Sequence, residues 1–215
     1  MKGIKAVIFD FDGVLVESVD IKTKTFAKMY QQYGSEIEKS VIDFHLAHGG
    51  VSRNEKLRYY EERLLGRHLS LEKENLLAKT FSDMVKTDVI KAPFVPGAEQ
   101  FLLSYHQRLA LFVVSGTPHE ELYDILAKRD MLKYFLSVYG APYRKFEAIE
   151  NILMLYGFDG QSVVMVGDSR TDYEEAMIAG INFIGRSSTN NFAFPPDIKT
   201  IPDLTILHLY LQNQE

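Results

Sequence analysis

The chain has 215 residues, 46% of them hydrophobic, which is enough for one large domain or for a core with a smaller insertion. Its 24 basic and 29 acidic residues give a net charge of −5, and this balance argues against a protein that grips nucleic acid or an anionic membrane. The sequence has no cysteine, no apolar run of the ~20 residues that span a bilayer and no signal-peptide core, so we expect a cytoplasmic protein without disulfides or thiolate chemistry.

The first predicted element is a short buried strand over 6–9, followed directly by Asp10, Asp12 and Gly13. Open α/β sheets bind their ligands at the carboxyl ends of strands, so the two carboxylates stand where chemistry is expected. Taken alone, the same residues would also suit a turn that Asp merely caps. The later motifs favour the chemical interpretation.

A helical region follows this strand. The spacing of apolar residues predicts four consecutive helices, over 18–34, 35–48, 52–66 and 71–86. The Pro/Gly-rich stretch 92–97 then marks a return to the sheet. We therefore expect a helical cap domain over 17–91, inserted into a core domain formed by 1–16 and 92–215.

Beyond residue 97 the predicted helices and strands alternate. Strands are expected over 109–114, 135–139, 162–166 and 182–184, and helices over 98–105, 118–128, 145–156 and 171–179. This alternation is typical of an α/β Rossmann-like fold, with a parallel sheet, right-handed crossovers and helices on both faces. The tail after Arg186 receives no assigned place in this scheme.

A run of small and hydroxyl residues, Ser115, Gly116 and Thr117, follows the strand expected over 109–114. The Ser115 hydroxyl and the amides near Gly116 and Thr117 could bind a phosphate group in front of the next helix. The alternative is that Ser115 or Thr117 is only the N-cap of that helix.

Lys145 stands at the start of the helix expected over 145–156. A lysine is unfavourable beside the positive end of a helix dipole, so an anion nearby would explain its position. Arg144 competes for the same role, and an incidental surface lysine is the other interpretation.

Two further carboxylates, Asp168 and Asp172, follow the buried strand expected over 162–166 and Gly167. Oxygen ligands of this kind suit Mg²⁺, which binds through one or two carboxylates and the phosphate oxygens of a substrate. Asp172 could instead cap the helix that begins there.

In order along the chain, Asp10-x-Asp12-Gly-Val, Ser115-Gly-Thr, Lys145 and Gly167-Asp168-Ser-x-x-Asp172 resemble the four motifs of the haloacid dehalogenase-like (HAD) hydrolase superfamily. The resemblance covers nearly the whole chain. The helical insertion is similar to the cap of the branch that contains phosphoglycolate phosphatases and β-phosphoglucomutases.

The resemblance implies a Mg²⁺-dependent phosphatase that acts on a small phosphorylated metabolite. Asp10 would be the nucleophile that becomes an aspartyl-phosphate, and Asp12 would act as general acid and then as general base. Such an acid needs a raised pKa, which nearby negative charge or burial would provide.

The resemblance also implies how the phosphoryl group and the metal are held. Ser115 and Lys145 would hold the phosphoryl oxygens. Mg²⁺ would be bound by the Asp10 carboxylate, the Asp12 backbone carbonyl and Asp168, with Asp172 in support.

The loop 48–56 between two cap helices carries Arg53 and Lys56, which are candidates for contacting the remote part of the substrate. The Gly-Val-Ser-Arg run is similar to the substrate-recognition loop of β-phosphoglucomutases, so a sugar-phosphate mutase is the alternative function. The competing structural interpretation is a helix start in which Ser52 and Glu55 form a capping box and Arg53 is solvated.

A third hypothesis is a non-catalytic regulatory module with the same fold. We expect a monomer or homodimer that binds a small metabolite, not nucleic acid or a membrane. The hinges of the cap are expected near Glu17 and near 91–93, where the chain crosses between the two domains.

Overall fold

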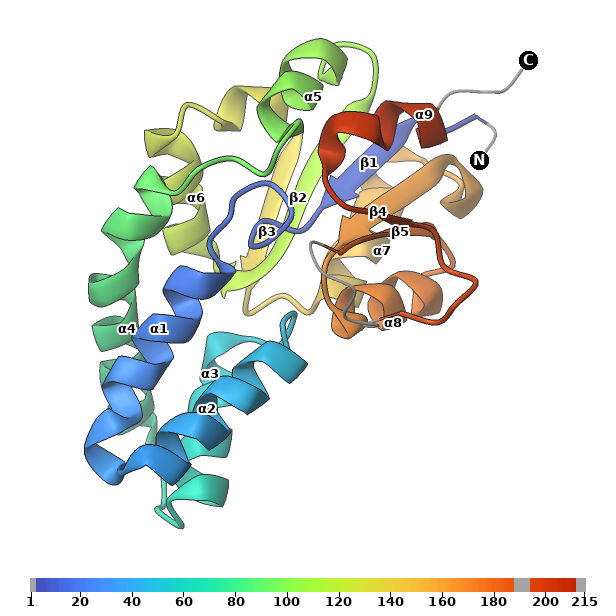
Figure 1. Cartoon of the computed structure of the whole chain (residues 1–215). Helices are drawn as coiled ribbons and strands as arrows, with labels where there is room; N and C mark the ends of the chain where they lie inside the picture. Colours follow the sequence, from blue (N-terminus) through green and yellow to red (C-terminus); the bar gives the residue numbers. More distant parts are fainter. Residues whose placement is uncertain (1–2, 188–193, 212–215) are drawn as a thin grey trace.

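The computed structural model describes residues 3–187 and 194–211 and contains a parallel sheet of six strands (Figure 1). The strands are β1 (Ala6–Phe9), β2 (Ala110–Pro118), β3 (Ser137–Ala141), β4 (Val163–Gly167), β5 (Asn182–Arg186) and β6 (Thr200–Ile201). They lie in the order β3-β2-β1-β4-β5-β6. The parallel sheet confirms the α/β Rossmann-like fold that the alternating pattern predicts.

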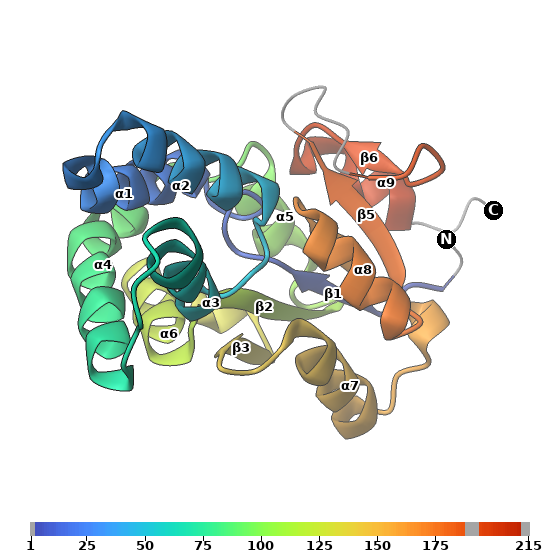
Figure 2. The ribbon, with the colours of Figure 1, turned by 90° about the horizontal axis from the view of Figure 1, so that it is seen from below.

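Strand β1 lies at the centre of the sheet and is buried on both faces. Val7 and Phe9 pack on one face against helices α5 (Ala98–Tyr105), α6 (His119–Lys128) and α9 (Leu207–Leu211). Ala6 and Ile8 pack on the other face against α7 (Lys145–Tyr156) and α8 (Arg170–Ile178). Figure 2 shows where these two helices lie beside the strands. This two-sided burial explains why the strand is a continuous apolar run.

The region between β1 and the Pro/Gly-rich stretch 92–97 is helical, as expected. It consists of α1 (Val19–Tyr30), α2 (Ser35–Ala47), α3 (Arg53–Arg58) and α4 (Leu71–Lys91), with a 3-10 turn over Gln31–Tyr33 and a π-helix over Tyr59–Leu64. The third predicted helix is therefore two segments, and the fourth runs five residues beyond the expected end at 86. Aromatic rings from several of these helices, including Phe26, Tyr60 and Phe81, pack in the interior of this unit.

The two chain crossings between the helical unit and the sheet lie side by side. The Glu17 N–H donates to the Pro93 carbonyl at 3.0 Å, and Val16 forms an isolated antiparallel bridge with Phe94. The Arg129 guanidinium donates to the carbonyls of Val89, Ile90 and Ala92 at the end of α4. These contacts fall at the positions where hinges are expected.

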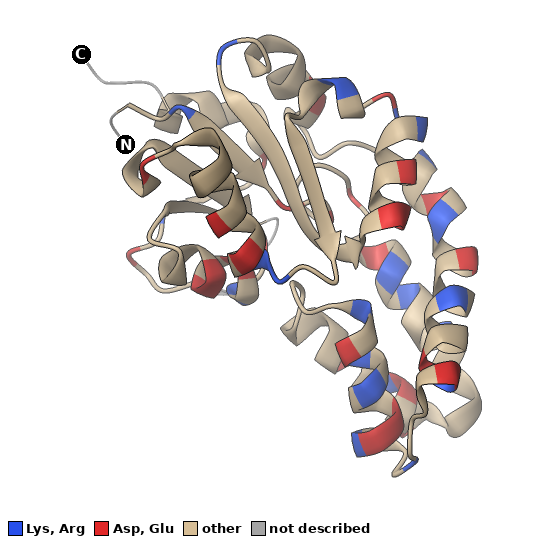
Figure 3. Cartoon of the chain, turned by 180° about the vertical axis from the view of Figure 1, so that it is seen from behind, with Lys and Arg blue, Asp and Glu red and all other residues tan. Residues whose placement is uncertain are grey.

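Acidic and basic residues are interspersed over the helices, whereas β2 and β3 carry none (Figure 3). In the described residues, no helix is both long and apolar enough to cross a membrane. The tail after Arg186 adds the edge strand β6 and helix α9 to the sheet domain, while its residues 188–193 and 212–215 lie outside the described ones.

Candidate active site

Three carboxylates from separate segments meet at the carboxyl edge of the sheet. Asp10 follows β1, Asp168 follows β4, and Asp172 lies in the first turn of α8. One oxygen from each lies within 4.8 Å of the others. Burial raises the pKa of Asp10 to about 7 against the opposing effect of Lys145, and burial together with Asp10 raises the pKa of Asp168 well above its usual value. The cluster thus has more buried negative charge than its protein neighbours neutralise.

Lys145 is the buried cation of this cluster. Its ammonium lies 3.1 Å from Asp10 Oδ1 and also contacts Asp172 Oδ1. Burial would lower the pKa of Lys145, but Asp10 and Asp172 outweigh that effect and raise it, so the side chain is an ammonium. Arg144, the competing candidate, is the exposed N-cap residue of α7 and lies 3.4 Å from Glu175 instead.

Asp172 takes part in capping helix α8, which is the alternative interpretation that the sequence offers for this residue. Its Oδ2 accepts from the Ser169 N–H at 3.0 Å and from the Ser169 hydroxyl at 2.6 Å, which forms a capping box at the start of α8. Its other oxygen accepts from Lys145. Asp172 therefore holds Lys145 and the β4–α8 turn in place.

Gly13 permits the close approach of the first and last motifs. Its φ is +73°, and a Cβ added there would lie 2.1 Å from Asp168 Oδ2. Only glycine combines this backbone conformation with this lack of space. The turn after β1 is therefore shaped to admit the Asp168 carboxylate.

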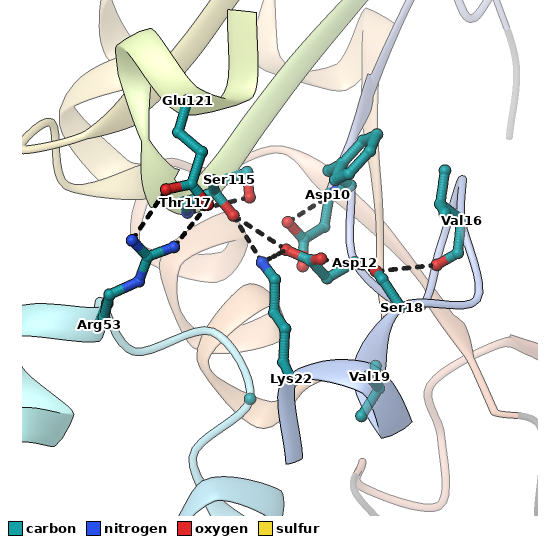
Figure 4. A network of polar contacts seen from close by, with 12 residues as sticks. Asp10, Asp12, Val16, Ser18, Val19, Lys22, Arg53, Ser115, Thr117 and Glu121 are labelled. Atoms are coloured by element: carbon teal, nitrogen blue, oxygen red, sulfur yellow. Dashed lines mark hydrogen bonds and ion pairs between the residues drawn. The ribbon is translucent and has the colours of Figure 1, made fainter. Parts of the chain in front are cut away.

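Asp12 is bound by a cation that the sequence analysis missed. Lys22, from α1, donates to Asp12 Oδ2 at 2.5 Å and to Thr117 Oγ1 at 2.7 Å, while Ser18 donates to Asp12 Oδ1 at 2.6 Å (Figure 4). Burial would raise the pKa of Asp12, but Lys22, Ser18 and Thr117 outweigh it and hold the pKa below its usual value. The expectation of a raised pKa for Asp12 is wrong for this arrangement, because Lys22 stabilises the carboxylate.

The segment Ser115 to Thr117 belongs to the end of β2, and α6 begins only at His119 with Pro118 as N-cap residue. The interpretation of Ser115 or Thr117 as an N-cap is therefore wrong. Ser115 Oγ accepts from the Thr117 N–H at 3.2 Å, and both residues line the same cavity as Asp10 and Gly116.

The cap loop lies against this edge of the sheet. A Cβ added to Gly50 would lie 2.8 Å from Ser169 Oγ, and a Cβ added to Gly116 would lie 3.1 Å from the Gly50 carbonyl oxygen. The loop therefore lies directly against the segments that follow β4 and end β2.

Arg53 forms a buried ion pair between the two units. Its guanidinium donates to Glu121 Oε1 at 2.6 Å and to Oε2 at 2.8 Å (Figure 4). It also donates to Ser82 Oγ at 2.5 Å. Arg53 lies on α3 of the cap, and Glu121 lies in the first turn of α6 on the sheet. The competing interpretation, in which Arg53 is solvated, is wrong, because the residue is only 6% exposed. Ser52 is the N-cap of α3, as expected.

Removing the charge of only one partner of the Arg53–Glu121 pair should destabilise the protein strongly. We expect Arg53→Met or Glu121→Met alone to lower the free energy of unfolding by about 3 kcal/mol, because each leaves a buried charge without its partner. The double variant should recover most of this loss. Denaturant unfolding of the four proteins measures the coupling.

The pair between Lys86 and Asp124 is a matched control, because it also joins a cap helix, α4, to α6, at 2.5 Å, but it is about one-third exposed. Its removal by Lys86→Met should cost less than about 1 kcal/mol. Equal losses of unfolding free energy at the two pairs would contradict the larger contribution expected of the buried Arg53–Glu121 pair.

Lys56 and His45 form a second polar contact in the cap. Lys56 donates to His45 Nδ1 at 2.9 Å and lies 3.4 Å from the Gly49 carbonyl oxygen. Burial, reinforced by Lys56, lowers the pKa of His45 to about 2, so its ring is neutral. Both side chains line the cavity of about 510 Å³ that also contains Asp10 and Asp12.

The structure thus brings most of the sequence-predicted residues to one cavity and adds partners that the sequence analysis did not name. Lys145 and Asp172 do not line this cavity, and the contacts of Lys145 with Asp10 and Asp172 join both residues to the site. Asp10, Asp12, Ser115, Gly116, Thr117, Asp168, Arg53 and Lys56 line this cavity. The missed partners are Ser18, Lys22, His45 and Glu121. Ser18, Lys22 and Phe26 recur every four residues on one face of α1, and this spacing was a signal that Lys22 faces inward.

With this geometry established, comparison with known proteins identifies the family. Residues 7–186 match the family model described as haloacid dehalogenase-like hydrolase. This chain belongs to that family. The match spans all four motifs and the helical insertion, so the resemblance predicted from the motifs is confirmed.

Relatives of this HAD-like hydrolase carry phosphatase names. It is 27% identical over 194 residues to a phosphorylated carbohydrates phosphatase of Thermotoga maritima, covering 84% of each chain. It is 22% identical over 206 residues to a phosphoglycolate phosphatase of Photobacterium profundum, covering 90% of this chain and 88% of the relative. A solved β-phosphoglucomutase from Clostridium difficile has the same fold, with a TM-score of 0.78 at 17% identity over 95% of this chain and 93% of that one.

Proposed function

We propose that this protein is a Mg²⁺-dependent phosphatase that hydrolyses a small phosphomonoester through an aspartyl-phosphate on Asp10. The family match and the phosphatase relatives confirm the expected enzyme class, a HAD-like phosphohydrolase. The observation that carries the finer proposal is the meeting of Asp10, Lys145 and Asp168 at one edge of the sheet.

Asp10 is the proposed nucleophile. Attack by a carboxylate on a phosphate dianion is opposed by charge repulsion, so cations must surround the point of attack. Lys145, 3.1 Å from Asp10 Oδ1, supplies one such charge. The Ser115 hydroxyl and the amides of Gly116 and Thr117, which line the same cavity, are the proposed donors to the phosphoryl oxygens.

Asp12 is the proposed general acid and base. Its carboxylate, held ionised by Lys22, is ready to take a proton from the water that hydrolyses the aspartyl-phosphate. Protonation of the leaving alcohol requires the opposite state of Asp12. Because Lys22 belongs to the cap helix α1, a movement of the cap would separate it from Asp12 and raise the pKa of that carboxyl.

The donor set suits a divalent metal ion. Asp10, Asp168 and Asp172 present carboxylate oxygens within 4.8 Å of one another, and hard oxygen ligands of this kind suit Mg²⁺. We propose Asp10, Asp168 and the Asp12 carbonyl as its ligands, with Asp172 in a supporting position. The raised pKa values of Asp10 and Asp168 indicate that the cluster lacks positive charge. When bound, Mg²⁺ supplies this charge.

The observation that motivated a sugar-phosphate mutase was Arg53 in the cap loop. In the structure both terminal nitrogens of its guanidinium donate to Glu121, so it is not free to hold a second phosphate with the cap in this position. We therefore favour the phosphatase.

The affinity for Mg²⁺ should increase as the pH rises. The pKa of Asp10 is raised from 3.8 to about 7, so the metal-free folded protein holds a proton that Mg²⁺ must displace. The protonated Asp10 side chain stabilises the metal-free folded protein. This contribution to stability is fully present below about pH 3.8 and is lost as the pH rises through about 7. We therefore expect Mg²⁺ to bind more tightly, and to raise the melting temperature more, at pH 8 than at pH 6.

Titration calorimetry in buffers of different ionisation enthalpy would count the protons released by Mg²⁺. Equal Mg²⁺ affinity and equal melting-temperature increments at pH 6 and pH 8 would contradict the proposed ligand set.

The proposed function is tested by assaying phosphate release from sugar phosphates, phosphorylated acids, phosphoglycolate and nucleotides with Mg²⁺ and with EDTA. We expect release from at least one ester that requires Mg²⁺. Isomerisation of a sugar 1-phosphate without phosphate release would select the mutase instead, and inactivity on the whole panel would count against both.

A further inference from the structure

The cavity over Asp10 and Asp12 contains more than the proposed catalytic groups. Its apolar wall includes Val19, Phe26, Val51 and Phe81, and its volume of about 510 Å³ is typical of sites for small metabolites. Among the residues that the structure describes, four cationic side chains also line it: Lys22, Arg53, Lys56 and Arg170. Their pairing decides which of them is available to a ligand.

Three of these cations already have a carboxylate partner within the protein. The pairs are Lys22 with Asp12 at 2.5 Å, Arg53 with Glu121 at 2.6 Å and Arg170 with Glu174 at 2.7 Å. Each is therefore electrostatically satisfied before any substrate enters.

Lys56 differs from them. It is 3% exposed, and among residues 3–187 and 194–211 no carboxylate oxygen lies within 4.0 Å of its nitrogen. Its polar contacts are the neutral His45 ring and the Gly49 carbonyl oxygen. A buried ammonium without an anion is costly, and burial, with Lys22 adding to it, lowers the pKa of Lys56 to about 7. An anion in the cavity would supply the missing partner.

We infer that Lys56, with His45, is the subsite for a second anionic group of the substrate, a carboxylate or a further phosphate at the end remote from the scissile phosphoryl group. This inference rests on the proposed phosphatase function. Because Nδ1 of His45 accepts from Lys56, its Nε2–H is left as a further donor. The favoured substrate class is therefore phosphomonoesters of acidic metabolites, not those of neutral sugars or alcohols.

The test compares kcat/KM within matched substrate pairs that differ in the second anion. The carboxylate arm uses 6-phosphogluconate against glucose 6-phosphate and phosphoglycolate against ethyl phosphate, and the phosphate arm uses glucose 1,6-bisphosphate against glucose 1-phosphate. We expect the wild-type protein to prefer the anionic member of at least one arm tenfold or more. The arm that shows the preference identifies the chemistry of the second anion.

Variants then assign the preference to Lys56. Lys56→Met should reduce the preference at least tenfold, while Lys56→Arg, which keeps the charge, should retain part of it. Lys24→Met is the matched control, because Lys24 is an exposed lysine of the cap helix α1. Should Lys56→Met not fold, Lys56→Gln replaces it.

Equal kcat/KM for both members of every pair in the wild type would overturn the inference, as would a preference that survives loss of the Lys56 charge. Either result is separable from failure of the proposed function, because hydrolysis of the neutral esters with Mg²⁺ would still show a phosphatase. The wild-type comparison needs no variant, so equal kcat/KM within every pair overturns the inference even if all Lys56 variants misfold.

Discussion

We expect Asp10→Asn to lower Mg²⁺-dependent phosphate release by about 10⁴-fold or more, because an amide oxygen cannot form the covalent intermediate. The structure adds a second expectation that separates catalysis from folding. Because the pKa of Asp10 is raised to about 7, the carboxylate that the folded protein holds at pH 8 lowers its stability relative to the unfolded chain. Metal-free Asp10→Asn should therefore be more stable than the wild type at pH 8, by about 1 to 3 kcal/mol.

Denaturant unfolding at pH 8 in EDTA, beside the activity assay, measures both effects. The control is Asp43→Asn, which removes an exposed carboxylate of α2 that pairs with Lys39. Residual activity within tenfold of the wild type would contradict the role of Asp10, and lower stability of the variant would contradict the electrostatic description of the cluster.

The second large effect is expected at the metal site. Asp168→Asn should weaken Mg²⁺ binding at least tenfold and lower phosphate release by about 10²-fold or more, because it removes one proposed charged ligand at the site of attack. The melting temperature of the variant should no longer rise with millimolar Mg²⁺. An unchanged Mg²⁺-dependent thermal shift would place the metal elsewhere.

Much of the fold could be predicted because the local signals agree with the tertiary structure. The apolar runs at 6–9 and 163–166 become β1 and β4, which are buried on both faces. The helix expected over 145–156 spans those residues as α7. Boundaries were less predictable where tertiary contacts override propensity, as in the π-helix Tyr59–Leu64, which interrupts the helical period, and in β2, which continues to Pro118.

The candidate site was predictable for the residues whose side-chain chemistry and position directly after a strand both indicate a ligand site. Asp10, Asp12 and Asp168 follow β1 and β4 and do meet. The pairings were not predictable, because Lys22 reaches Asp12 and Arg53 reaches Glu121 across the contact between cap and sheet. Periodicity shows which face of a helix is buried, but not which charge on another element it contacts.

The covalent intermediate on Asp10 provides the most direct test of the account. In Asp12→Asn with p-nitrophenyl phosphate, whose leaving group needs no protonation, Asp10 should be phosphorylated but only slowly hydrolysed, since the general base is missing. Acid quenching followed by peptide mapping should then place one phosphoryl group per chain on the peptide that contains Asp10. Turnover without any phosphorylated protein, or a phosphoryl group on another residue, would contradict the account.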